Sequence, residues 1–138
     1  MRKIILVLSV IVLLLCGSCK QQAGEGGMGT IQGKVLERKM SNDFSHCLGQ
    51  YPAADFSVYI IYGDDVTYGN NMNTGPDGVY EFQYLRKGSY RIYVYSNDSA
   101  GTLGPPINAN APKKAIYKDA RITSNKQVVD AGTTIIYN

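Results

Sequence analysis

The sequence predicts an all-β protein, a two-layer β-sandwich of about seven strands. From Lys20 onward the chain holds 16 Val and Ile residues and 11 Tyr but only 4 Leu, and β-branched and aromatic residues are typical of strands. After the first fifteen residues no run of ten has a helical apolar period, whereas several runs alternate with period two. A chain of roughly 110 residues can bury one such core but not a second domain.

The first residues predict a cleaved signal segment, residues 1–18, that does not belong to the fold. Arg2 and Lys3 supply positive charge, and Ile4–Leu15 is an apolar run of 12 residues interrupted only by Ser9. A transmembrane helix needs about 20 residues to cross the hydrocarbon layer. A signal peptide therefore fits this run better than a membrane span.

The end of this segment resembles a bacterial lipoprotein signal. Gly17 and Ser18 match the two small residues that precede the modified cysteine in that family, and Cys19 matches the cysteine itself. The resemblance implies cleavage before Cys19 and a diacylglycerol on its sulfur, so that acyl chains such as palmitate anchor the protein. An ordinary secretory signal that ends near a cysteine is the alternative. We therefore expect a lipid-anchored protein of the bacterial cell envelope, at the outer membrane. The sequence does not decide whether the domain faces the periplasm or the cell surface.

Residues 19–29 predict a lipidated cysteine followed by a flexible tether, because Ala23–Gly29 holds four glycines in seven residues. The three cysteines of the chain then have separate fates. Cys16 leaves with the signal and Cys19 is acylated, so Cys47 has no partner for an internal disulfide. Cys47 could be buried, free, or bridged to another chain.

The predicted β-domain, residues 30–138, opens with an alternating strand at Thr30–Arg38. Met40–Ala54 has no period of either kind and is predicted to be a loop. Phe56–Tyr62 is mostly β-branched and aromatic, which predicts a central strand. A polar, asparagine-rich stretch follows, with a short strand expected at Val66–Tyr68.

A hairpin is predicted next. Gly75–Gly78 carries Pro at its second position and Gly at its fourth, as tight turns do. Val79–Leu85 and Ser89–Ser96 alternate on either side of Arg86–Gly88, which predicts two strands joined by a short turn. One face carries the apolar set, which is Tyr80, Phe82, Tyr90, Ile92 and Val94. The opposite face carries Glu81, Gln83, Arg91, Tyr93 and Tyr95.

The remaining chain predicts one long loop and the last strands. Asn97–Pro112 is rich in Asn, Gly and Pro and has few large apolar residues, so it is predicted to be a loop. Strands are predicted at Lys114–Thr123, Gln127–Val129 and Thr133–Tyr137.

The turn and the strands beside it resemble the carboxypeptidase-regulatory-like, or transthyretin-like, domain. The similar residues are Gly33-Lys34-Val35, Thr74–Phe82, Leu85, Gly88, Tyr90, Ile92 and Val94. The resemblance implies a Greek-key β-sandwich of the immunoglobulin-like or transthyretin-like type. It also implies a non-catalytic accessory or adhesive module.

The charge balance argues against nucleic acid as a partner. Removal of residues 1–18 takes Arg2 and Lys3 away, which leaves 12 of the 14 basic residues against 11 acidic ones. A surface that binds phosphates needs a basic patch, and the sequence contains none.

The sequence contains few patterns of catalysis or metal binding. His46 is the only histidine, which excludes a metal site with two or more histidines. His46 and Cys47 could act as base and thiolate, but neighbouring residues of an extended strand point to opposite faces. Because of this geometry, an enzyme that uses Cys47 ranks last of the three alternatives for function. Asp64–Asp77 is rich in oxygen ligands without the spacing of a calcium loop, and its calcium binding stays open. We expect no catalysis, no cofactor and no metal.

The best ligand-binding candidates are Arg91, Tyr93 and Tyr95, because exposed aromatic rings on a sheet can stack on sugars or anchor a protein. The first hypothesis is a membrane-anchored structural or protein-interaction module with an envelope protein as its partner. The alternative is a surface lipoprotein that binds a polysaccharide through Tyr93 and Tyr95 or through Asn97–Pro112. The pattern assigns no face to five other tyrosines, which are Tyr51, Tyr59, Tyr62, Tyr68 and Tyr84.

Overall fold

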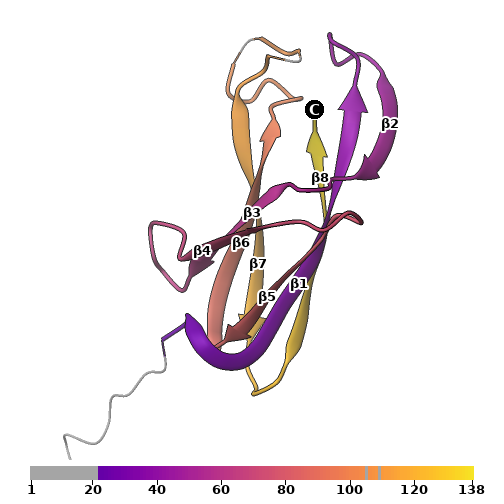
Figure 1. Ribbon diagram of the computed structural model, residues 1–138. Coiled ribbons are helices and arrows are strands. Elements are labelled where there is room, and N and C mark those ends of the chain that lie inside the picture. The colour runs from indigo at the N-terminus through magenta and orange to yellow at the C-terminus, as the bar shows by residue number, and fades with distance from the viewer. Residues whose placement is uncertain (1–21, 105, 109) are drawn as a thin grey trace, which may run out of the picture.

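The protein is a β-sandwich, seen in a computed structural model that describes residues 22–104, 106–108 and 110–138. These ranges form eight strands in two four-stranded sheets that pack face to face (Figure 1). They contain no helix that is long and apolar enough to span a membrane. The predicted all-β sandwich is confirmed, with eight strands in place of about seven.

The first sheet is built around β1 (Glu25–Met40), a strand of 16 residues. On one side, β1 pairs antiparallel with β5 (Val79–Leu85) near its start and with β2 (Cys47–Pro52) near its end. On its other side, β1 pairs in parallel with β8 (Val128–Tyr137). One long strand therefore holds three partners together.

The second sheet is antiparallel throughout and has the order β4-β3-β6-β7. Its strands are β4 (Asn70–Asn73), β3 (Ser57–Tyr62), β6 (Gly88–Asn97) and β7 (Lys113–Ile122). The register between β6 and β7 is unbroken from Gly88 to Asn97. These two long strands form a regular surface on which side chains from neighbouring strands line up in rows.

The structure shows that the predicted hairpin of β5 and β6 is wrong. The two strands lie in different sheets, and the chain crosses from one layer to the other at Arg86–Gly88. Each strand still turns its predicted apolar set inward, because period-two alternation reports which face is buried. The pattern does not report which strand is the hydrogen-bonding partner, so both arrangements fit the same sequence.

Two short strands differ from the predictions. β2 lies within Met40–Ala54, which was predicted to be a loop. Four of its six residues pair with β1 in an uninterrupted register, yet nearly all its side chains are exposed, so it has no apolar period to detect. The strand expected at Val66–Tyr68 is absent, and β4 forms at Asn70–Asn73 instead.

The glycine-rich segment is not a free tether along its whole length. β1 begins at Glu25, inside the stretch Ala23–Gly29. A Cβ on Gly27 would collide with the backbone oxygen of Leu85, and one on Gly29 would lie 2.7 Å from Ile122 Cδ1. These glycines therefore allow close packing between β1 and its neighbours. The sandwich begins before the predicted boundary at residue 30.

At the other end of the chain, β8 is one strand where two were predicted. Its pairing with β1 skips between Asp130 and Thr133, and Gly132 there has a positive φ of 76°. This is the geometry of a β-bulge, which a glycine accommodates without strain. Because the bulge interrupts the period-two alternation, the sequence pattern predicts two strands where the structure has one.

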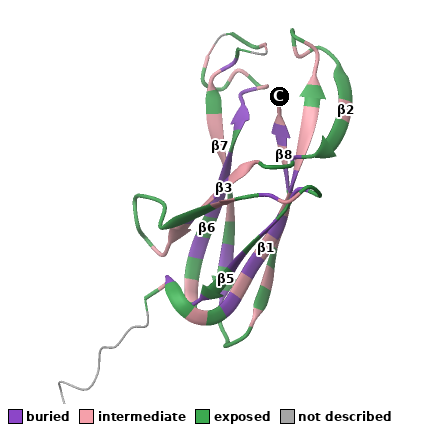
Figure 2. Ribbon diagram, in the orientation of Figure 1, coloured by how far each residue is buried: buried purple, intermediate pink, exposed green. Residues whose placement is uncertain are grey.

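The core lies between the two sheets and takes buried residues from both of them. Figure 2 shows buried positions along the strands of both layers. All five members of the predicted apolar set are buried. The rest of the core comes from the other strands, and its largest members are Ile31, Val35, Val58, Ile60, Leu85, Ile122 and Ile136.

The loop after β6 is fastened by one buried carboxylate. Asp98 Oδ1 accepts hydrogen bonds from Lys114 Nζ at 2.8 Å and Thr102 Oγ1 at 2.9 Å, and Oδ2 accepts one from the Leu103 amide. The ammonium group of Lys114 is the main reason that the pKa of Asp98 falls to about 2. A charged residue thus orders the start of this predicted loop.

Candidate functional site

Three tyrosines line up across the outer face of the second sheet. Tyr59 of β3 pairs with Tyr93 of β6, and Tyr93 pairs with Tyr117 of β7. Residues that are directly opposite in antiparallel strands project from the same face. The strand register therefore gathers residues that are 58 positions apart in the chain into one row.

Two more tyrosines extend the row into a cluster, which we call the tyrosine face (Tyr59, Tyr68, Tyr93, Tyr95 and Tyr117). The rings of Tyr59 and Tyr93 are stacked, with centroids 4.9 Å apart and planes 14° apart. Tyr68, from the loop after β3, and Tyr95 meet the Tyr59 ring edge-on at 5.1 and 5.8 Å. Each such pair of rings contributes about 0.5–1.5 kcal/mol of stability in addition to the effect of the area that it buries.

Tyr93 differs from the sequence expectation of an exposed contact residue. Its ring is on the outer face, as predicted, but it is only 9% exposed because Tyr59, Tyr95 and Tyr117 surround it. Burial among these rings, followed by the effects of Tyr95, raises the pKa of Tyr93 to about 12. Tyr93 is thus a neutral scaffold for its neighbours and offers little surface to a ligand.

The surface that a ligand can reach belongs to the other rings. Tyr68 is 50%, Tyr95 43% and Tyr117 54% exposed. Asn71, on the edge strand β4, lies opposite Tyr59 in the register and is also exposed. Exposed aromatic rings and an amide therefore share one sheet surface.

Arg91 continues this surface along β6. Its guanidinium lies 5.7 Å from the centroid of the Tyr117 ring, and its Nε donates a hydrogen bond to Asp119 Oδ1 at 3.0 Å. Both side chains of this ion pair are more than half exposed, so the pair adds little stability. Its position beside Tyr117 makes it available to a ligand.

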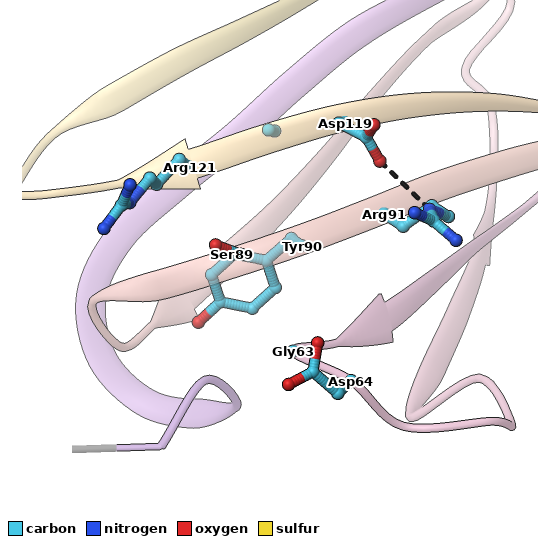
Figure 3. Close-up of a pocket in the computed structure, with 8 residues that line it drawn as sticks. Gly63, Asp64, Ser89, Tyr90, Arg91, Asp119 and Arg121 are labelled. Carbon is cyan, nitrogen blue, oxygen red and sulfur yellow. Dashed lines mark hydrogen bonds and ion pairs between the residues drawn. The ribbon is translucent and has the colours of Figure 1, made fainter. Parts of the chain in front are cut away.

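A shallow cleft opens on the far side of this ion pair, with a volume of about 420 Å³. Its polar lining consists of Asp64, Ser89, Arg91, Asp119 and Arg121, and we call it the arginine–aspartate cleft. Figure 3 shows Arg91 and Asp119 joined across β6 and β7, with Asp64 on the loop that follows β3. The tyrosine face and the cleft thus share Arg91 as a common border.

The other candidate residues are not part of this site. His46 Nδ1 lies 2.6 Å from Ser45 Oγ, and Cys47 Sγ donates to the Gly49 carbonyl at 3.6 Å, so neither ring nor thiol is bonded to the other. Cys47 is exposed and free, which excludes the buried alternative. Within the described ranges, no three His, Cys, Asp or Glu side chains gather as metal ligands would. Cys19 lies outside the described residues.

Sequence reasoning found Arg91, Tyr93 and Tyr95 but missed Tyr59, Tyr68 and Tyr117. The alternation of β3 could have placed Tyr59 on an outer face, since the next residue, Ile60, is buried. In β7 the buried residues are Ala120 and Ile122, which alternation places on the face opposite Tyr117. Tyr68 lies in a loop, where no period exists to assign its direction.

No model of a protein family matches this chain, and curated proteins provide no match either. Among solved structures, the chain is similar to a crystal structure from Pseudomonas aeruginosa of a proposed carbohydrate binding protein. The TM-score is 0.46 and the sequence identity 11%, and the match covers 84% of this chain and 92% of that chain.

Proposed function

We propose that this protein is a non-catalytic lipoprotein of the bacterial cell envelope whose β-sandwich binds a polysaccharide through the tyrosine face. One observation carries the proposal: the exposed rings of Tyr68, Tyr95 and Tyr117 lie beside hydrogen-bonding side chains on one sheet surface. A sugar ring has an apolar face of C–H groups and a polar rim of hydroxyls. Aromatic rings with polar groups close by complement both.

The composition of this surface favours a carbohydrate over the protein partner of our first hypothesis. Among the described residues that the strand register places on the outer face of the second sheet, only Ile61 and Ala115 are aliphatic. Ser, Asn, Arg and Asp surround the tyrosines there. Protein interfaces are depleted of Ser, Asp and Lys, whereas Ser57, Asp119 and Lys113 lie on this face beside the tyrosines.

The site is held by strands, which suits recognition of a repetitive ligand. Two of the contact rings, Tyr95 and Tyr117, come from β6 and β7, and the third, Tyr68, comes from the loop after β3. All three rings contact the stacked pair of Tyr59 and Tyr93. Side chains that are fixed before binding lose little conformational entropy when a ligand arrives. A flat, preordered surface can therefore accept several units of a chain.

The test is binding of the purified protein to immobilised and soluble polysaccharides in native affinity gels. The double change Tyr95→Ala with Tyr117→Ala should weaken retention by about tenfold or more, because two aromatic contacts are lost. Tyr51→Ala is the matched control, since Tyr51 is 55% exposed but lies on β2 in the other sheet. Equal retention of all three proteins, or retention of none, would overturn the proposal.

A protein-interaction role stays as a second candidate because of a different surface. Leu48, Leu103 and Ile107 are at least half exposed. β2 and the loop after β6 lie at one end of the sandwich, away from the described N-terminal residues (Figure 1). The measurement is a crosslinked pull-down from detergent-solubilised native membranes. A near-stoichiometric envelope protein that is lost with Leu103→Ser would support this role, and its retention would contradict it.

A further inference from the structure

We infer that the arginine–aspartate cleft is a second subsite for the same chain and that it selects sugars without charge. The inference rests on the proposed function, because it assumes that the tyrosine face binds the preceding units of a polysaccharide. The ligand class is then a neutral glycan, and four side chains would form hydrogen bonds with its hydroxyls. These are Arg91, Asp119, Arg121 and Asp64.

The two surfaces are continuous. Arg91 lies against the Tyr117 ring on one side and lines the cleft on the other. Along β6 and β7, the paired residues change from Tyr93 and Tyr117 to Arg91 and Asp119 within two positions. Two residues of a strand span about 7 Å, so a chain lying on the tyrosines reaches the cleft within one or two sugar units.

The charges of the cleft cancel. Two arginines and two aspartates line it, and Arg91 is already paired with Asp119 at 3.0 Å. A sugar carboxylate placed near Arg91 would also lie close to the carboxylate of Asp119, whose Oδ1 is 3.0 Å from the Arg91 Nε. Like charges at such distances oppose binding, so the arrangement gives a polyanion no net attraction.

The same groups fit hydroxyls well. A hydroxyl both donates and accepts a hydrogen bond, and the cleft offers guanidinium donors beside carboxylate acceptors. In the described part of the chain, the Arg91–Asp119 contact uses only Nε and Oδ1, and Arg121 and Asp64 have no ion-pair partner. The remaining nitrogens and oxygens can bind adjacent hydroxyls of one sugar. Hydrogen bonds to charged groups of this kind are stronger than neutral ones.

The test compares neutral and acidic polysaccharides with the full-length protein in detergent. The neutral probes are laminarin, galactomannan and xyloglucan, and the acidic probes are polygalacturonate and alginate. We expect at least one neutral probe and neither acidic probe to retain the protein. Retention by the neutral probe should change by less than about twofold between roughly 50 and 500 mM NaCl, because no counterions are exchanged.

Variants separate the cleft from the tyrosine face. Arg121→Gln and Asp119→Asn should each weaken binding of the neutral probe by about tenfold, since each removes a charged partner of a hydroxyl. Glu81→Gln, on the exposed face of β5 in the first sheet, is the matched control and should bind as the wild type does. Circular dichroism should show the same fold for all.

The outcomes distinguish the inference from the proposed function. If polygalacturonate or alginate binds more tightly than every neutral probe, or if both cleft variants bind normally while Tyr95→Ala with Tyr117→Ala does not, the inference is overturned and the proposed function stands. If no polysaccharide is retained by the wild type, both fail.

Discussion

Phe82 tests, at the scale of one residue, which face of β5 forms the core. Its ring is 5% exposed and packs near Tyr80 with centroids 6.0 Å apart. Phe82→Ala should lower the free energy of unfolding by about 3–5 kcal/mol, because it removes apolar contacts and leaves a cavity. Urea denaturation measures this loss. Glu81→Ala, exposed on the same strand, should change it by about 0.5 kcal/mol or less, and a loss below about 1 kcal/mol for Phe82→Ala would invert our assignment of the face.

The carboxyl group of Asp98 makes the stability of the fold depend on pH. Its pKa is lowered to about 2 in the folded protein, mainly by Lys114, against about 3.9 in an unfolded chain. A lowered carboxyl pKa stabilises the fold above the unfolded pKa, and this contribution is lost as the pH falls from about 4 toward 2. Asp98→Asn removes the charge without changing the shape of the side chain.

The expected result is a difference in melting temperature between wild type and Asp98→Asn that is largest at neutral pH and shrinks below about pH 4. Melting curves followed by circular dichroism across this pH range measure it. Asp43 also has a lowered pKa, from hydrogen bonds with Ser41 and Ser45, but it contributes equally to both proteins. A difference that stays constant from pH 7 to about 2 would contradict the role of Asp98.

The sequence predicted the direction of single side chains better than their exposure. Alternation placed Arg91, Tyr93 and Tyr95 on the outer face of β6, and the structure confirms this. It could not show that Tyr93 is covered, because the covering rings of Tyr59 and Tyr117 come from strands far away in the sequence. Exposure depends on tertiary neighbours, which one strand's pattern does not contain.

At the scale of elements, the glycine-rich start of β1 is where composition and structure disagree most, because its composition predicts a flexible tether and the structure shows a paired strand. Gly27→Ala should destabilise the protein by about 1–3 kcal/mol, since its methyl group would collide with the Leu85 carbonyl and force the strands apart. Urea denaturation provides the measurement. Met28→Ala is the control, because Met28 is 61% exposed on the same strand.

If Gly27→Ala proves as mild as Met28→Ala, the glycine-rich stretch is a tether after all and does not pack on β5. Hydrogen exchange gives a second readout. The amide of Arg86, which donates to the Gly24 carbonyl at 2.8 Å, should exchange slowly in the wild type and faster in Gly27→Ala.

Strands with one buried face were predictable, and strands without one were not. β3, β5, β6 and β7 bury alternate residues and so carry a period that the sequence shows. β2 is held by main-chain pairing with β1 and exposes both faces, so nothing in its side chains marks it as a strand. Glycines that pack closely also look like glycines that bend freely until their neighbours are known.

For the whole molecule, the two-layer architecture followed from composition, but the pairing of strands did not. The parallel contact of β1 with β8 joins the two ends of the domain, and the crossing at Arg86–Gly88 moves the chain between layers. Both depend on contacts between distant segments. The tyrosine face is a product of that pairing, since β3, β6 and β7 each supply part of it.

The proposed lipid anchor at Cys19 would fix how far the tyrosine face lies from the membrane. Gly24 is hydrogen-bonded to both Arg86 and Tyr90, so the chain is held against the sandwich at this position. Five residues of chain from Cys19 to Gly24 reach at most roughly 18 Å, which would keep the sandwich close to the membrane. Cys19→Ser should abolish labelling with radioactive palmitate and move the protein from the membrane to the soluble fraction, because the acylated sulfur is gone. Cys16→Ser and Cys47→Ser are the controls and should stay labelled, and loss of label in either one, or its persistence in Cys19→Ser, would show that the anchor lies elsewhere.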